Sequence, residues 1–347
     1  MPRPKRSEQF ADDEVCIVHT VQRCVRRAFL AGVDPVSGVD YSHRREWIRR
    51  RMEALASVFG VDVLTYAVMS NHLHTVLRNR PDVVAAWNDE EAATRWLRVF
   101  PGRRLEEHLA EPTTNDVATL VGDREKLASV RKRLSDISWF MRALSEPIAR
   151  MANRQDDCTG RFWEGRFKCQ RIVDEAGLLA CSLYVDLNPI RAAMAESPER
   201  SVHTGVYDRI EAAGGSRIDS AAFDLKTLPT PDEAGKELRD TPVAELKERR
   251  RRKKRSPTGR KVARDGWLCP MKLDDQTLGD DPQVHTGGLR GSDRGYLPVG
   301  LGVYRSLLRY AVEGGKKVAE VVTDIPEEVR STLAAVGIDA SMFGELI

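Results

Sequence analysis

The N-terminal part of the chain alternates between strand-like and helix-like patterns of apolar side chains. An apolar, β-branched run at 15–21 predicts a buried strand. Residues 41–59 carry apolar side chains three and four positions apart, which predicts an amphipathic helix. Two more apolar runs, at 61–69 and 72–77, are separated by a short polar turn and predict a hairpin. This β-α-β-β order predicts a mostly antiparallel sheet with helices on one or both of its faces.

Helical patterns dominate the middle of the chain. A helix is predicted at 85–99, and one long or two shorter helices at 116–154. Residues 160–173 alternate aromatic, basic and apolar side chains, which predicts a fourth strand. Another helix is predicted at 174–188, and Pro189 is expected to mark its end.

The composition is that of an ordinary globular protein. Hydrophobic residues make up 41% and charged residues 31% of the 347 positions. No apolar run approaches the ~20 residues that span a bilayer, and the N-terminus lacks the apolar segment of a secretory signal, so no membrane partner is expected. The six cysteines include no Cys-x-x-Cys pair, so a zinc knuckle is not predicted and reduced thiols are expected.

The net charge of +3 conceals an uneven distribution. Eleven of the 55 Lys and Arg residues, but only one of the 52 acidic residues, lie between 247 and 264, so the rest of the chain carries a net charge of −7. The centre of this basic tract is Arg251, Arg252, Lys253, Lys254 and Arg255. Lys and Arg bind polyanions by releasing counterions from phosphates. We therefore predict a DNA tether, with a solvated linker as the alternative.

Two histidines, His72 and His74, are the first chemical signal. On a strand, residues i and i+2 point to the same face, so both imidazoles converge while Leu73 points to the opposite side. Two neutral imidazoles can hold two positions of a divalent metal ion; two half-exposed histidines without a ligand are the alternative. Position 76 is Val, which excludes a nucleotide hydrolase that needs a third histidine there. The other histidines, His19 among them, show no such spacing and are expected to be structural.

A tyrosine and an asparagine form the second signal. Tyr184 and Asn188 are four residues apart in a predicted helix and therefore share one face. The phenol then lies beside an amide oxygen, a nucleophile next to a third metal ligand. A phosphodiester is attacked when a metal ion neutralises its non-bridging oxygens and holds the phosphorus in line with a hydroxyl. The alternative is a core tyrosine with a helix-capping asparagine.

A segment at 160–168 combines cations with aromatic rings, the composition of a groove for single-stranded nucleic acid. The predicted DNA contacts here are Arg161, Trp163, Arg166 and Lys168. Phe162 and Phe167 are expected to pack in the core instead. Arg191, just beyond the tyrosine helix, is expected either to bind a phosphate or to pair with Asp186.

The two signals together resemble a known family. The histidine pair within YAVMSNHLHTVLR and the tyrosine and asparagine within SLYVDLNPIRAAMAESPE are similar to the motifs of single-tyrosine HUH transposases. Among these, they most resemble the REP-associated tyrosine transposases of bacteria. The strand IVHTVQR and the segment GRFWEGRFK follow the order of that family, and the resemblance covers roughly residues 12–210.

The resemblance implies an α+β fold, in which a ferredoxin-like antiparallel sheet with helices forms the HUH endonuclease core. It implies a transposase that recognises single-stranded DNA hairpins and uses Mg²⁺ or Mn²⁺ to cut one strand, with the tyrosine becoming linked to the 5′ phosphate. Carried over to this chain, the metal ligands are His72, His74 and Asn188, and the nucleophile is Tyr184. A bacterial, cytoplasmic protein associated with the nucleoid is expected, acting as a monomer or a homodimer.

Three regions are predicted along the chain. A catalytic domain at 1–212 contains a helical insertion at about 82–157, a linker at 213–292 carries the basic tract, and a small helical or irregular extension occupies 293–347. Two alternatives stay open for the function. One is a domesticated hairpin-binding protein that no longer cuts DNA, and the other is a plasmid-type replication initiator or relaxase.

Overall fold

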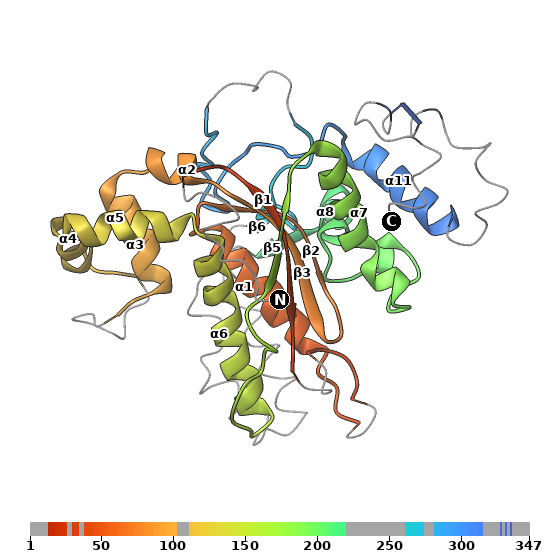
Figure 1. Cartoon of the computed structure of the whole chain (residues 1–347), viewed down its shortest axis with the longest axis horizontal. Helices are drawn as coiled ribbons and strands as arrows, with labels where there is room; N and C mark the ends of the chain where they lie inside the picture. Colours follow the sequence, from red (N-terminus) through yellow and green to blue (C-terminus); the bar gives the residue numbers. More distant parts are fainter. Residues whose placement is uncertain are drawn as a thin grey trace, which may run out of the picture.

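A four-stranded antiparallel sheet forms the centre of the protein, which we describe from a computed structural model (Figure 1). The structure describes residues 13–25, 30–34, 38–102, 111–219, 261–273 and 281–314, with single positions at 327, 330, 331 and 334. The strands are β1 (Ile17–Arg23), β2 (Val61–Val68), β3 (His72–Asn79) and β4 (Lys168–Ile172). They are ordered β2-β3-β1-β4, and each neighbouring pair is antiparallel.

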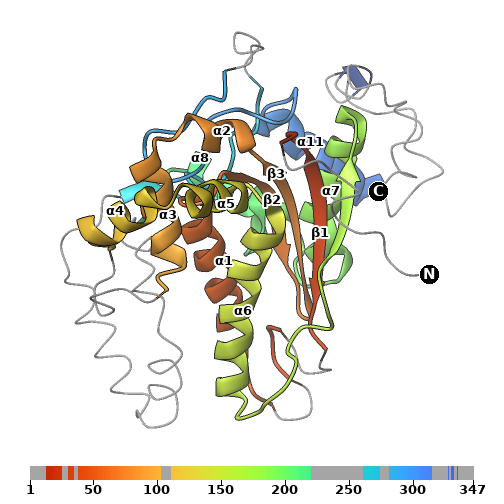
Figure 2. The same cartoon turned by 60° about the vertical axis from the view of Figure 1, so that its left-hand side comes forward.

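Two helices connect these strands and cover one face of the sheet (Figure 2). α1 (His43–Ala56) leads from β1 to β2, α6 (Ile137–Gln155) precedes β4, and the two helices pack against each other. Val18 of β1 is fully buried, and Thr20 donates to Sδ of Met141 on α6 at 3.8 Å. The β-α-β-β-α-β order with this strand order is the ferredoxin-like arrangement. The predicted α+β fold with a ferredoxin-like antiparallel sheet is confirmed.

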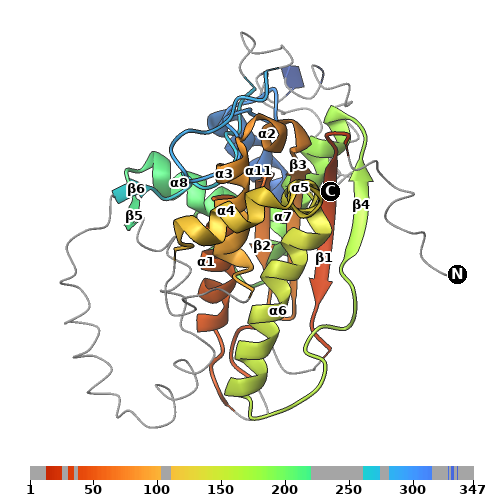
Figure 3. The same cartoon turned by 90° about the vertical axis from the view of Figure 1, so that its left-hand side faces the viewer.

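The helical insertion between β3 and α6 contains four short helices in its described part (Figure 3). These are α2 (Pro81–Ala86), α3 (Asp89–Val99), α4 (Thr114–Gly122) and α5 (Arg124–Leu134). The single helix predicted at 85–99 is two helices, because Trp87 adopts an extended conformation and Asn88 caps the next helix by accepting from the backbone N–H of Glu91. Residues 116–154 likewise form parts of three helices, α4, α5 and α6.

The opposite face of the sheet is covered by α7 (Glu175–Arg191), which packs on β2 and β3. Asp174 caps this helix by accepting from the N–H of Gly177 at 2.6 Å. The helix extends past the predicted end at residue 188: Pro189 lies inside its last turn, and the N–H of Ala192 still donates to the carbonyl oxygen of Asn188. The helices α8 (Gly205–Ala213) and α11 (Leu301–Gly314) complete this layer.

The fourth strand is shorter than predicted and forms the open edge of the sheet (Figure 3). Of the predicted 160–173, Lys168–Ile172 form the regular ladder with β1, and Trp163 makes an isolated antiparallel bridge with Cys24 just beyond β1. The preceding residues bend, with Gly160 at φ +99°, so that Phe162 and Phe167 are both buried despite their odd separation. Both rings belong to the core of α1 and α6, whereas an uninterrupted strand, whose successive side chains alternate between faces, would place them on opposite faces.

Residues beyond α8 return to the sheet rather than leaving it. β5 (Arg217–Asp219) pairs with β6 (Lys261–Ala263), and the segment after β6 lies against the edge of β2, with Cys269 N–H donating to Val63 O at 3.0 Å. Trp267 is fully buried in the same core as α1 and α6. The boundaries of the three predicted regions stay a prediction. Within the described part of the predicted linker, Trp267, Leu268, Cys269 and Met271 are buried in the two hydrophobic cores.

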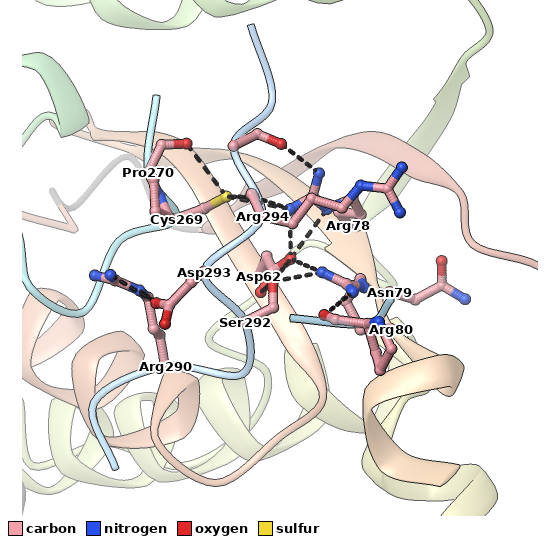
Figure 4. Close-up of polar contacts among 12 residues, drawn as sticks. Asp62, Arg78, Asn79, Arg80, Cys269, Pro270, Arg290, Ser292, Asp293 and Arg294 are labelled. Carbon is pink, nitrogen blue, oxygen red and sulfur yellow. Dashed lines mark hydrogen bonds and ion pairs between the residues drawn. The ribbon is translucent and has the colours of Figure 1, made fainter. Parts of the chain in front are cut away.

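A buried charge cluster fastens this C-terminal segment to the hairpin of β2 and β3 (Figure 4). Asp62 accepts from Arg78 at 2.7 Å, from Arg80 at 3.2 Å and from Ser292 at 2.8 Å, and its side chain is fully buried.

Within the described residues no helix is both long and apolar enough to cross a membrane.

Candidate active site

The hairpin between β2 and β3 places the histidine pair at the start of β3. His72 and His74 share the face of the sheet that α7 covers, with ring centroids 4.7 Å apart, while Leu73 is buried on the other face. His72 is half-buried and His74 is only 4% exposed. The predicted convergence of the two imidazoles is present.

Tyr184 reaches the histidines from α7. Leu179, Leu183 and Leu187, four residues apart, bury one stripe of the helix in the core that it shares with β2 and β3. The phenol ring lies edge-on to His74 with ring centroids 5.7 Å apart. The strand and the helix, distant in sequence, therefore bring the candidate nucleophile to the histidine pair.

A third imidazole, from His19 of β1, completes this cluster. Its ring stacks on His74 at 5.1 Å with an interplanar angle of 11°, and its Nε2 lies 2.9 Å from Nδ1 of His74. Tyr184 touches the same ring edge-on at 6.1 Å. His19 was expected to be structural, but the strand register places it directly opposite Val76 and diagonal to His74. A polar residue inside an otherwise apolar strand was the one signal in the sequence.

Asn188 lies one helical turn beyond Tyr184. Its Nδ2 donates to the carbonyl oxygen of Tyr184 at 2.9 Å, which leaves the amide oxygen to face away from the helix backbone. α7 starts just after β4 ends, opposite Ile17, and runs toward the end of the sheet where β3 begins. The place of Asn188 one turn beyond Tyr184 associates it with the cluster, and its role as a metal ligand stays a prediction.

Burial keeps the three imidazoles neutral. Desolvation lowers the pKa of His74 to about 3, with His72 and His19 adding a smaller effect, and it lowers the pKa of His19 to about 4. The pKa of His72 is also lowered, first by burial and then by the nearby Arg23. Neutral imidazole is the form that binds a metal ion.

Hydrogen bonds leave one nitrogen of each paired histidine available. His72 Nδ1 lies 2.6 Å from Oδ1 of Asn71, which can only accept, so the proton is on Nδ1 and Nε2 keeps its lone pair. His74 Nε2 is buried and has no hydrogen-bond partner among the described residues. The predicted donor set of two imidazole lone pairs and the Asn188 amide oxygen has the chemistry that a hard or borderline divalent ion binds. The described residues contain no group of three His, Cys, Asp or Glu side chains arranged to hold a metal ion, so the fit depends on the amide.

Exposed cations border the site on the sheet. Arg23 is the register partner of His72, and Lys168 is the partner of Val21, which itself lies opposite His74. Directly opposed residues on neighbouring strands point to the same face. Arg23 and Lys168 are both exposed, so the imidazoles and two cations share one face of the sheet.

The other predicted DNA contacts differ in their exposure to solvent. Arg161 and Arg166 are exposed, whereas Trp163 is half-buried and its indole N–H donates to the carbonyl of Ser145 on α6 at 2.9 Å. Phe162 and Phe167 are buried in the core, as predicted. Residues 251–255 of the basic tract lie outside the described residues.

Arg191 does not pair with Asp186, which settles one alternative left by the sequence. Asp186 is fully buried and accepts from Thr65 at 2.8 Å, Tyr304 at 2.7 Å and the N–H of Val206 at 3.1 Å, whereas Arg191 is exposed at the end of α7. The carboxylate therefore anchors α7 to β2, α8 and α11.

Comparisons with known proteins give one distant likeness. No family model and no curated protein matches the chain. A solved structure of a REP-associated tyrosine transposase bound to a REP hairpin matches 60% of this chain and 84% of its own, with 10% sequence identity and a TM-score of 0.34.

Proposed function

We propose that this protein is a metal-dependent endonuclease and strand transferase that cuts single-stranded DNA next to hairpins, as a transposase does. The observation that carries the proposal is the contact of the Tyr184 phenol with the imidazole of His74, at a centroid distance of 5.7 Å. The two residues come from sequence motifs about 110 positions apart, and each motif alone has an ordinary structural explanation. Their meeting in one cluster supports a shared chemical role.

Cleavage requires a nucleophile, a positive charge at the phosphate and a fixed geometry. The Tyr184 oxygen forms a bond to phosphorus, the bond from phosphorus to the 3′ oxygen breaks, the phenol proton passes to water, and the 3′ oxygen takes up a proton. The chain keeps a 5′-phosphotyrosine and releases a 3′-OH that can reverse the reaction. His72, His74 and Asn188 would hold a divalent ion, Mg²⁺ or Mn²⁺, which would supply positive charge at the non-bridging oxygens.

The chain itself orients the substrate. Arg23 and Lys168 flank the histidines on the same sheet face, where two successive phosphates of a strand crossing the sheet would meet them. α7 holds Tyr184 rigidly, because Asp186, two residues further along, is fixed by three donors. A nucleophile on a rigid element retains the alignment that in-line attack needs.

The test is a covalent adduct between the protein and a labelled single-stranded DNA hairpin in the presence of Mg²⁺ or Mn²⁺, detected on a denaturing gel. We expect an adduct with the natural protein, none with Tyr184→Phe, and a strong reduction with His72→Ala. Tyr207→Phe removes a phenol from another half-buried tyrosine, on α8, and is expected to leave the adduct unchanged.

Two results would contradict the proposal. An adduct that persists in Tyr184→Phe would show that another residue is the nucleophile. A hairpin that is bound without any adduct would favour a binding protein that no longer cuts DNA.

A further inference from the structure

His19 takes no part in the chemistry proposed above, yet it lies at the centre of the cluster. Its ring stacks on His74 with the two planes 11° from parallel, and its Nε2 is 2.9 Å from His74 Nδ1. His19 contacts both a candidate metal ligand, His74, and the candidate nucleophile, Tyr184. Three roles are open to it: a third metal ligand, a proton acceptor for Tyr184, or a partner that orients His74. The hydrogen bond decides among these roles.

Only one of two proton arrangements lets His74 bind a metal ion. If His19 Nε2 carried the proton and donated, His74 Nδ1 would accept, and its proton would sit on Nε2, which is buried without a partner among the described residues. A buried N–H without an acceptor is costly. If His74 Nδ1 carries the proton and donates to His19, His74 Nε2 presents a lone pair instead.

The same arrangement is independently present at the other histidine. The amide oxygen of Asn71 can only accept, so His72 must donate from Nδ1, over 2.6 Å, and keep a lone pair on Nε2. Metal-binding histidines usually donate their second N–H to an acceptor that fixes the ring and its tautomer. Asn71 and His19 are thus equivalent partners, one for each imidazole of the pair.

We propose that His19 is a positioning residue, which accepts the Nδ1–H of His74 and thereby presents His74 Nε2 to the divalent ion. The inference rests on the proposed function, because it assigns His74 to the same metal site. It also excludes two other roles for His19. Its Nε2 lone pair is already engaged, so it does not ligate the ion, and in a neutral ring the remaining nitrogen, Nδ1, carries the proton and cannot accept one from Tyr184.

The experiment compares His19→Phe and His19→Gln. Phenylalanine keeps a flat ring to stack on His74 but has no acceptor, whereas the glutamine amide oxygen can reach the position of the imidazole Nε2 and accept. Gln170→Ala changes the register partner of His19 on β4 and is the matched control. Two readouts are needed: Mn²⁺ affinity by isothermal titration calorimetry, and the His74 tautomer in metal-free protein by long-range ¹H–¹⁵N correlation NMR.

We expect His19→Phe to weaken Mn²⁺ binding about 10- to 100-fold, the usual effect of removing such a partner. His19→Gln is expected to restore most of the affinity, and Gln170→Ala to leave it unchanged. The NMR spectrum of the natural protein is expected to place the His74 proton on Nδ1, and His19→Phe to shift it toward Nε2.

Three results would overturn the inference: a His74 proton on Nε2 in the natural protein, unchanged Mn²⁺ affinity in His19→Phe, or no Mn²⁺ bound by the natural protein. These outcomes are separate from the adduct assay. If Mn²⁺ binding depends on His19 but no Tyr184 adduct forms, the positioning role survives and the proposed function fails.

Discussion

The buried imidazoles determine how the site responds to pH. At pH 5.5 an ordinary histidine, with a pKa of ~6.5, is about nine-tenths protonated, so two such ligands would lose about 100-fold in metal affinity. Here burial lowers the pKa of His74 to about 3 and that of His72 in the same direction. Mn²⁺ affinity measured by calorimetry should therefore fall less than about tenfold between pH 7.5 and pH 5.5. A loss near 100-fold would contradict the buried, neutral pair.

The same shifts affect stability with a definite sign. The unfolded chain binds protons on these histidines at a higher pH than the folded protein does, so the free energy of unfolding declines as the pH falls from about 6.5 toward the lowered values. In mild acid, Mn²⁺ affinity is therefore expected to fall only slightly, whereas the free energy of unfolding declines. The calorimetric experiment needs a parallel denaturation curve at each pH.

Arg23 is an exposed cation beside the histidine pair. The strand register places it opposite His72. We expect Arg23→Gln to weaken binding of a single-stranded hairpin several-fold. The slope of log affinity against log salt concentration should become shallower by about 0.7, the contribution of one neutralised phosphate. Arg23→Lys should recover most of the affinity, and Arg124→Gln, exposed on α5, should have no effect. Hairpin titrations at several salt concentrations measure both, and an unchanged salt slope would remove Arg23 from the DNA face.

The candidate site was predictable only where both partners belong to one element. The period of a strand places His72 and His74 together, and the period of a helix aligns Tyr184 with Asn188. Joining the two motifs required the resemblance to a family, since nothing in the local pattern states that α7 covers β3. His19 was missed because its place beside His74 depends on the register of β1 against β3, a pairing across 55 positions.

The elements themselves were predicted well where apolar periodicity was strong. The predicted strand at 160–173 is confirmed only at 168–172, because two aromatic side chains five residues apart are buried in one core, which a regular strand cannot do. The C-terminal packing was missed for a similar reason. Trp267 lies between glycine-rich and charged stretches, and no local pattern marks it as core.

α8 packs so closely on β2 that a single added methyl group tests whether this packing holds the site in place. A Cβ on Gly205 would lie 2.2 Å from Oγ1 of Thr65, whose hydroxyl donates to Asp186 on α7. We expect Gly205→Ala to destabilise the protein by about 1–3 kcal/mol, measured by urea unfolding, because α8 must move away from β2. Gly122→Ala on α4, where an added Cβ meets open space, is the control. An equal, small effect of both substitutions would mean that α8 is not fixed against the sheet.

The segment at 281–300 packs against the β2–β3 hairpin through buried polar contacts. Arg78 and Arg80 are almost fully buried, and Asp62, which pairs with both, also binds Ser292. Removing one partner of a buried charge leaves the other uncompensated. The segment at 281–300 is therefore part of what keeps the β2–β3 hairpin, and with it the histidine pair, in place.

The pairing of β5 with β6 allows residues 220–260, which include most of the basic tract, to be replaced in an experiment. β5 and β6 pair so that Asp219 lies opposite Lys261, which means that the ends of the chain between 219 and 261 are already neighbours. A two-residue Asn-Gly turn can join such paired ends. Replacing 220–260 by this turn should leave the thermal midpoint and the Tyr184 adduct at saturating hairpin nearly unchanged, because β5 and β6 keep their pairing across the new turn.

The replacement should nevertheless weaken hairpin binding. The slope of log affinity against log salt concentration should become shallower by about 0.7 for each phosphate that the protein no longer neutralises. A second variant keeps the length and changes Arg251, Arg252, Lys253, Lys254 and Arg255 to glutamine, so that charge and chain length are tested separately. If both variants bind as the natural protein does, the tract is a solvated linker. If either loses the adduct at saturating hairpin while its thermal midpoint is unchanged, the tract belongs to the active site, since a tether adds affinity without taking part in the attack on phosphorus.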